Sequence, residues 1–278
     1  MDELEERKQW VRQHLERAHS LPTLPVVIAR VIGMVDRPQT SSRQLGDEIA
    51  KDQVLTAKVL KLVNSGFYGF SRPISTITHA VTMLGFDAVK GLVLGCSALE
   101  DMEEALPGLW EHSLACARTC AFIAEHRRMG EVEELSVSGL LHDLGKVVLY
   151  QGFAQQFYQV RSLVETGDLL FYEAENEVLG AHHGLVGGWL LEKWTLPAKL
   201  VAPVSDHHDF RPHRSHAEWT AVVHLADVLC RAEALGNGGD RKVPQLQPAA
   251  LKLLDLGLED IRRIMERLDA ELDDIPRM

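Results

Sequence analysis

Residues 139–149 read GLLHDLGKVVL and place a histidine and an aspartate side by side within an apolar stretch of helical character. The surrounding leucines and valines favour burial of the whole segment. Burying His142 and Asp143 without polar partners would cost several kcal/mol. Either the two side chains satisfy each other locally or a positive charge is held between them, and the rest of the chain has to decide which.

The overall composition is that of an ordinary globular protein. Of the 278 residues, 46% are hydrophobic and 25% are charged, and this length suits one large domain or two smaller ones that share an interface. Lys and Arg number 29 against 40 Asp and Glu, which gives a formal net charge of −11. A chain of this charge repels nucleic acid and anionic membrane surfaces, so we expect neither as a partner.

Sequence features that would direct the chain out of the cytoplasm are not found. No run of about 18 apolar residues could span a bilayer, and the N-terminal sequence MDELEERKQWVRQHLERAHS is too highly charged for a secretory signal. The four cysteines form no CxxC pair, and a chain of this length does not need disulfides for stability. We therefore expect a cytoplasmic protein with reduced cysteines.

Apolar residues recur at helical spacing along most of the chain, and the alternation typical of strands is almost absent. The sequence therefore predicts an all-α fold. In the second half of the chain we expect helices at 135–150, 153–165, 168–180, 183–193, 197–207 and 216–235.

Stretches rich in proline and glycine divide this helical chain into three parts. We expect an N-terminal helical half at 1–105 and a second, metal-binding helical half at 106–235 that begins near Leu106. The remaining residues, 236–278, are interpreted as a linker and a C-terminal helix. That helix, at 259–274, carries an apolar stripe that either packs on the domain or forms a homodimer.

Seven metal-compatible side chains lie on helices that are otherwise apolar: His112, His142, Asp143, His183, His207, His208 and Asp227. One histidine of this kind is more often a core residue with its own hydrogen bonds than a ligand. Histidines and carboxylates gathered together suit Fe, Mn, Zn or Ni, and neighbouring ligands can hold two ions bridged by one carboxylate. The sequence therefore predicts a divalent metal site if the fold brings these side chains together.

Two residues that follow the His-Asp pair give a geometric hint. Lys146 lies three residues after Asp143 and hence on the same helical face, where it could neutralise a phosphate or a carboxylate. It could equally be a cation that complements the dipole near a helix C-terminus. Gly145 costs a helix about 1 kcal/mol relative to alanine, and it would allow another helix or a bound group to approach closely.

Several other side chains allow two interpretations. Cys116 lies one helical turn after the first candidate ligand and could add a sulfur ligand, although filling of the core is favoured. His182 is expected to be exposed or to form a hydrogen bond to a metal ligand without binding the metal itself. His224 either orients a ligand in the same way or lies on a helix face without a role. His213 and His216 are expected to face solvent.

The order of these motifs resembles the HD superfamily of metal-dependent phosphohydrolases, and within it the HD-related output domain, HDOD, which is similar to the HD-GYP domains. The resemblance extends over about residues 20–235. Its first part is carried by LPTLPVVIARVIGMV, by DxxLTAKVLKLVNSxFYG at 52–69 and by ISTITHAVTMLG at 74–85. Its second part is carried by LLHDLGK, by HxxVGGWLLEKWTLP at 183–197, and by the HH and HLAD motifs.

The resemblance implies an HD-like helical bundle with an N-terminal helical subdomain and a metal site of two ions. Asp143 would bridge the ions. One ion would be held by His112, His142 and Asp227, and the other by His183, His207 and His208. If the protein is an enzyme, the resemblance assigns catalytic roles to Asp143 and to Lys146, which would approach the phosphate or the bridging oxygen.

Two departures from the HD-GYP pattern bear on function. The sequence after His207–His208 reads DFRPHRSHAEW and contains no GYP motif, and Gly108 stands where some HD-GYP proteins place a metal-binding glutamate. We therefore expect neither cyclic di-GMP hydrolysis nor a third ion.

Two functions stay open at this stage. One is a regulatory module that retains the metal site and relays a signal to other signalling proteins. The other is a metal-dependent phosphohydrolase that acts on a nucleotide or another phosphorylated small molecule. An open coordination position beside a large pocket would favour the enzyme, and a closed metal site would favour the regulatory module.

Overall fold

The computed structural model describes residues 3–17, 26–35, 37, 39–64, 73–98 and 105–271 of the chain. All regular elements in these ranges are α-helices, with no strand among them, so the predicted all-α fold is confirmed. The motif residues 65–69 and the predicted helical residues 272–274 lie outside the described ranges.

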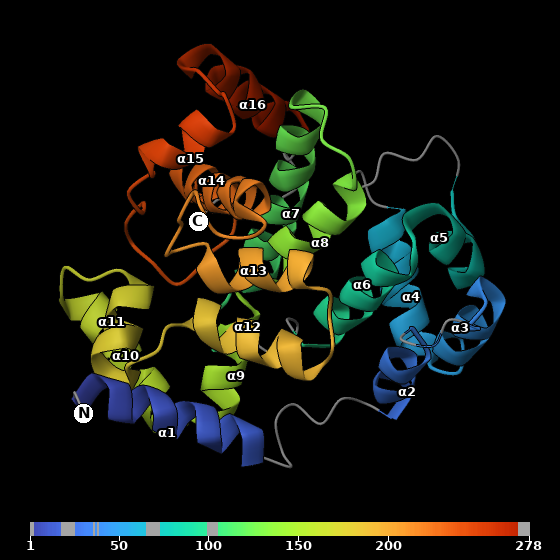
Figure 1. The fold of residues 1–278 in the computed structure, drawn as a ribbon, viewed down its shortest axis with the longest axis horizontal. Coiled ribbons are helices and arrows are strands. Elements are labelled where there is room, and N and C mark those ends of the chain that lie inside the picture. Colours follow the sequence, from blue (N-terminus) through green and yellow to red (C-terminus); the bar gives the residue numbers. More distant parts are fainter. Residues whose placement is uncertain are drawn as a thin grey trace.

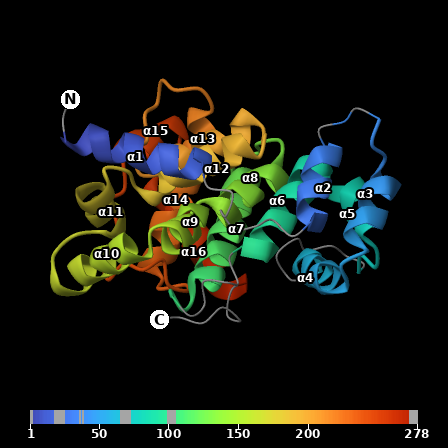
Figure 2. The same ribbon diagram turned by 90° about the horizontal axis from the view of Figure 1, so that it is seen from below.

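Helices α2 to α6 form one end of the molecule (Figures 1 and 2). Three of them begin at a polar residue, Ser41, Asp52 or Thr76, whose side chain accepts a hydrogen bond from a main-chain N–H of the first turn. The bounds of these helices are α2 (Val26–Val35), α3 (Ser42–Ile49), α4 (Gln53–Val63), α5 (Ile77–Leu84) and α6 (Phe86–Ala98).

The first helix, α1 (Glu3–Arg17), lies away from α2 to α6 and packs against α11 and α12 of the second half (Figures 1 and 2). The Trp10 ring meets the edge of Phe153, with ring centroids 5.2 Å apart. Lys193 donates a hydrogen bond to the carbonyl oxygen of Leu15 at 3.0 Å. The beginning of the chain therefore covers the part of the molecule that carries the metal-compatible residues.

The second half is a bundle of eight helices, followed by two more near the C-terminus. The bundle consists of α7 (Leu109–His126), α8 (Val132–Leu141), α9 (Leu144–Gly152), α10 (Ala154–Thr166), α11 (Phe171–Leu179), α12 (His183–Lys193), α13 (Ala198–Asp206) and α14 (Ala217–Ala232). Helices α15 (Pro248–Leu253) and α16 (Leu258–Glu271) follow. The single helix predicted at 135–150 is wrong, because the chain breaks between α8 and α9 at His142 and Asp143.

This break turns the two polar side chains toward the centre of the bundle instead of stacking them along one continuous helix. Asp143 has φ −94° and ψ 5°, which is outside the helical region, and it precedes the first residue of α9. Gly145 then allows α9 to lie against the start of α12, because a Cβ atom there would collide with the carbonyl group of His183. The close approach expected at Gly145 is therefore confirmed.

The apolar side of α16 packs on the domain. Ile264 and Leu268 are buried in the same apolar cluster as residues of α7 and α14. Of the two interpretations of this C-terminal stripe, packing on the domain is the one that the structure shows.

Candidate metal centre

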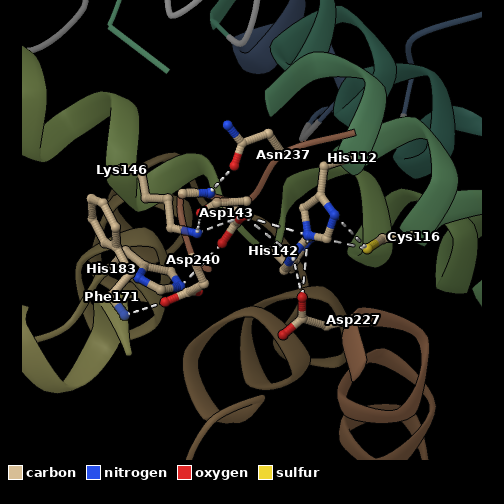
Figure 3. A network of polar contacts seen from close by, with 12 residues as sticks. His112, Cys116, His142, Asp143, Lys146, Phe171, His183, Asp227, Asn237 and Asp240 are labelled. Atoms are coloured by element: carbon tan, nitrogen blue, oxygen red, sulfur yellow. Dashed lines mark hydrogen bonds and ion pairs between the residues drawn. The ribbon is translucent and has the colours of Figure 1, made fainter. Parts of the chain in front are cut away.

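The seven predicted ligands converge on one buried region of the second half. Figure 3 labels His112, His142, Asp143, His183 and Asp227. The seven side chains come from α7, from the break between α8 and α9, from the start of α12, from the residues that follow α13, and from α14. All of them except His208, which is half-buried, are at most 1% exposed. Polar side chains this deeply buried need partners, and their mutual distances show which partners they have.

The first ligand group consists of His112, His142 and Asp227, together with Cys116. His112 Nε2 lies 3.2 Å from Asp227 Oδ1, and His142 Nε2 lies 3.7 Å from the same oxygen. Cys116 Sγ lies 3.5 Å from His112 Nε2. One atom from each of these four side chains falls within 4.8 Å of the others, so the thiol both fills the core and stands within reach of a cation held there.

The second ligand group consists of His183, His207 and His208. The Nε2 atoms of His183 and His208 are 2.9 Å apart, and all three rings offer one nitrogen within 4.8 Å of the others. The ring of Tyr172 stacks on His208 with centroids 4.3 Å apart and covers this group from outside. Three imidazoles that face one another in this way form a set of nitrogen ligands suited to Zn, Fe or Ni.

Asp143 lies between the two groups. Its Oδ2 atom is 3.5 Å from His142 Nε2 and 3.8 Å from His112 Nε2, whereas its Oδ1 atom is 3.0 Å from His183 Nε2. Lys146 Nζ donates a hydrogen bond to Oδ2 at 2.8 Å. One carboxylate oxygen thus faces each group, as a bridging ligand requires.

Three buried atoms in the centre lack a hydrogen-bond partner among the described residues. These atoms are His142 Nε2, His207 Nε2 and Asp143 Oδ1. The Nδ1 atoms of the two histidines donate to main-chain carbonyl groups three residues earlier, at 2.7 and 2.8 Å, so each Nε2 presents a lone pair when the ring is neutral. The same three residues offer atoms within 4.8 Å of one another. A cation satisfies such a set of acceptors, so these residues fit the divalent ions that the resemblance implies.

The electrostatics of the centre favour an added positive charge. Burial opposes ionisation of Asp143, but His142, Lys146 and His183 outweigh it and hold the pKa of the carboxyl well below its ordinary value. Burial likewise opposes a charge on His142, yet the neighbouring carboxylates raise its pKa. In the second group, burial lowers the pKa of His207 to about 3, so this ring is neutral and able to bind a metal over a wide pH range.

Glu175 supports the second group, and sequence reasoning missed it. Its Oε2 atom accepts hydrogen bonds from Nδ1 and from the main-chain N–H of His183, at 2.6 and 2.7 Å. This contact fixes the ring so that Nε2 faces Asp143. Glu175 is fully buried, and burial raises its pKa to about 8.

Arg231 and residues 236–240 close the centre on the other side. Arg231 Nε donates to Asp227 Oδ1 at 2.6 Å, and its Nη1 forms an ion pair with Asp240. Lys146 Nζ donates to the carbonyl oxygen of Gly238 at 2.6 Å (Figure 3). Arg231 could have been found from its spacing of four residues after Asp227 on one helix. Gly238 and Asp240 lie in a segment interpreted as a linker, where no periodic pattern points to a contact.

The four other histidines discussed in the sequence analysis differ in burial: His182 and His224 are buried, and His213 and His216 are exposed. His182 is only 2% exposed and lies 3.6 Å from Asp209, so the expectation of an exposed ring is wrong. His224 is buried, with Nδ1 donating to the carbonyl oxygen of His207 at 2.8 Å, so it supports a ligand-bearing turn. His213 and His216 are exposed, as predicted.

Comparison with known proteins identifies the family of this helical bundle. Residues 21–210 match the family model of the HDOD domain, and this match covers more than half of the chain. The chain therefore belongs to the HDOD domain family, and the resemblance seen in its motifs is confirmed. Among the described helices, none has the length and apolar character needed to cross a membrane.

Solved structures show the same fold. An HDOD domain protein of unknown function from Geobacter sulfurreducens is 30% identical, with a TM-score of 0.74 over 98% of this chain and 96% of that chain. A Shewanella amazonensis protein named "Putative phosphohydrolase" is 21% identical, with a TM-score of 0.67 over 92% and 93% of the two chains. A "Putative signal transduction protein" from Marinobacter aquaeolei is 21% identical, with a TM-score of 0.68 over 98% and 64%. The latter two likenesses show the fold alone.

A relative by sequence is an uncharacterized protein of Treponema pallidum (strain Nichols), which is 22% identical over 204 residues. The aligned region covers 71% of this chain but only 39% of that protein. The relative therefore contains further sequence outside the shared region.

Proposed function

We propose that this HDOD domain is a regulatory module of bacterial signal transduction that holds two divalent ions, of Fe, Mn, Zn or Ni, in the first and second ligand groups. Asp143 bridges the two positions. The support for the ions is the set of buried acceptor atoms on His142, Asp143 and His207 that no donor satisfies among the described residues. In a signalling role the ions stabilise the arrangement of the helices, and other proteins bind to the surface of the bundle.

The observation that carries the regulatory role is the closure of the centre by the chain itself. Lys146, the residue expected to approach a phosphate, is fully buried and hydrogen-bonded to Asp143 Oδ2 and to the carbonyl oxygen of Gly238. With Nζ engaged in this way, it is not presented to a substrate. A closed centre of this kind favours a structural or sensory metal site over turnover.

A metal-dependent phosphohydrolase is the second candidate, and one observation favours it. A cavity of about 410 Å³ opens beside His112 and is lined also by Arg231, Arg241 and Lys242. Its volume and positive charge suit a nucleotide or another phosphoester. Divalent ions in the two ligand groups would supply Lewis acidity toward such a substrate. Asp143 would hold the two positions together, and Lys146, once free of Gly238, would stabilise negative charge on the phosphoryl group.

We also propose partners and a location in line with the charge of the chain. A net charge of −11 disfavours nucleic acid and anionic membrane surfaces, so other signalling proteins or a phosphorylated small molecule are the partners proposed for this domain. The cytoplasm is the proposed location. Because the GYP motif is missing, cyclic di-GMP hydrolysis is not proposed.

Elemental analysis of protein purified without a chelator or a histidine tag tests the two-ion site. We expect about two equivalents of metal in the wild-type protein and their loss in Asp143→Ala, because that variant removes the carboxylate shared by both groups. His213→Ala, which removes an exposed histidine, is the matched control and should keep both ions. Wild-type protein without metal, or an Asp143→Ala variant with unchanged metal content, would contradict the proposal.

A phosphoesterase screen of the metal-loaded protein separates the two functions. The regulatory role predicts no turnover of nucleotides or of an aryl phosphodiester. Turnover that requires both Asp143 and Lys146 would establish the second candidate instead.

A further inference from the structure

Residues 236–240 (GNGGD), here called the glycine segment, place a carboxylate against one side of the metal centre. Asp240 accepts a hydrogen bond from the main-chain N–H of Phe171, the first residue of α11 (Figure 3). It also forms an ion pair with Arg231. The Asp240 side chain is 3% exposed and that of Arg231 is 5% exposed. The carboxylate thus sits on a buried guanidinium and a helix N-terminus, both of which attract anions.

The same short segment engages the other buried cation of the centre, and one donor remains unused. The carbonyl oxygen of Gly238 accepts the Lys146 hydrogen bond at 2.6 Å. Arg231 Nη2 is buried and has no hydrogen-bond acceptor among the described residues, although its side chain lines the neighbouring cavity. The donors around Asp240 therefore exceed what one carboxylate uses.

The cavity beside these donors is positively charged. It measures about 410 Å³ and extends from His112 and Arg231 along the glycine segment to Arg241 and Lys242. Among the described residues, Asp240 is the one acidic residue that lines it. Lys242 pairs with Asp168 at the protein surface. An anion that enters this cavity therefore meets the Arg231 guanidinium, whose Nη2 has no acceptor among the described residues.

We infer that the position held by Asp240 is an anion-binding site, and that a phosphate-bearing small molecule in the cavity displaces the Asp240 carboxylate from Arg231. A phosphate carries more oxygen acceptors than a carboxylate, so it can use both terminal nitrogens of the guanidinium together with the Phe171 N–H. The chain's own aspartate is then an internal competitor that keeps the site filled until the ligand arrives.

Displacement of Asp240 also reaches the metal centre. The glycine segment is held there by Asp240 at one end and by the Gly238 contact with Lys146, and its main chain packs on His112 at Gly236. Gly236 and Gly239 have φ values of +62° and +95°, a conformation that favours glycine. Release of the segment removes the Gly238 contact of Lys146, whereas its hydrogen bond to Asp143 is retained. This part of the inference rests on the proposed function, because it makes the ligand the signal that the module reads.

Titration calorimetry with inorganic phosphate tests the inference on the full chain after metal removal. Asp240→Asn keeps the size of the side chain and its acceptor for the Phe171 N–H but removes the competing charge, so phosphate affinity should rise at least about tenfold. The double variant Asp240→Asn/Arg231→Gln should lose this gain. Asp255→Asn, a change at an exposed aspartate paired with Arg127, is the matched control and should bind phosphate as the wild-type protein does.

Equal phosphate affinity in Asp240→Asn and wild-type protein, or a gain that survives the loss of Arg231, would overturn the inference. If the variants do not fold, hydrogen exchange in the metal-free wild-type protein provides the test. Phosphate should speed exchange at the N–H groups of Asn237 and Gly239, which bond to Gly108 and to the Asn237 side chain, and unchanged exchange would overturn the inference. Because both measurements use metal-free protein, a failure of the two-ion proposal appears only in the elemental analysis.

Discussion

The two ligand groups of the centre share Asp143 but differ in charge and exposure. The first group adds the Asp227 carboxylate and is almost completely buried, whereas the second consists of three histidines, one of which, His208, is half-buried. A cation in the first position meets two carboxylates, and a cation in the second meets one. Because charge interactions are strong in a buried site, we expect the first ion to be held more tightly and the second to exchange.

The largest expected effect is that of Asp227→Asn. Without this carboxylate the first position keeps only Asp143 as an anionic ligand, so we expect its metal affinity to fall by more than about a hundredfold, beyond the range for partners that only orient a ligand. Competition with a chromophoric chelator at neutral pH, read together with the metal content, measures the loss.

The counterpart variant, His208→Ala, sharpens the comparison. It removes a half-buried ligand of the second group only, so it should lose the exchangeable ion and keep the tight one. The proposed difference between the groups would be wrong if both variants lost the same ion or if His208→Ala lost both.

A smaller effect is expected from Glu175→Gln, which changes the support of the second group without removing a ligand. The glutamine can still accept one hydrogen bond from His183, but it no longer provides an acidic group behind the imidazole. We expect the affinity for the second ion to fall by about 10–100-fold and that for the first to stay unchanged. The same chelator competition reports both values. Glu177→Gln, an exposed position on the same helix, is the control and should change neither affinity.

The sequence predicted what depends on local pattern. Helical periodicity and punctuation by proline and glycine were enough for the all-α fold and for most helices of the second half. The break between α8 and α9 was missed, because the apolar residues around His142 and Asp143 continue the helical pattern across it. The break places those two side chains toward the centre of the bundle, and periodicity carries no signal for such a placement.

The residues of the candidate site likewise differ in whether the local sequence pattern was enough to predict them. The seven candidate ligands could be picked out because histidine and aspartate stand out in apolar helices, and the structure brings these side chains close together. Their role as metal ligands stays a prediction. Glu175 was not found, since it lies on a helix with two other glutamates and nothing in the sequence separates it from solvent-exposed ones. Asp240 and Gly238 act through contacts 69 and 92 residues distant in sequence, which only the folded chain defines.

The smallest expected effect is the pH dependence of stability in the metal-free protein. Burial lowers the pKa of His207 to about 3, from an ordinary value of 6.5. Between these values the unfolded chain binds a proton that the folded protein does not, so stability falls as the pH decreases from 6.5 toward 3. The slope for this one residue is at most about 1.4 kcal/mol per pH unit. Burial lowers the pKa of His183 and His208 in the same direction.

Two groups of the centre oppose this trend. The pKa of His142 is raised, although burial opposes the charge, because the neighbouring carboxylates favour its protonated form, so it adds stability on acidification. Glu175, with a pKa of about 8, loses stability as the pH rises from 4.5 toward 8. Urea unfolding of chelator-treated protein between pH 4.5 and 6.5 measures the balance. Replacing His207 by glutamine should flatten the acid decline, whereas replacing His142 by glutamine should steepen it. If the free energy of unfolding depended on pH in the same way in both variants, the proposed opposite pKa shifts of His207 and His142 would be wrong.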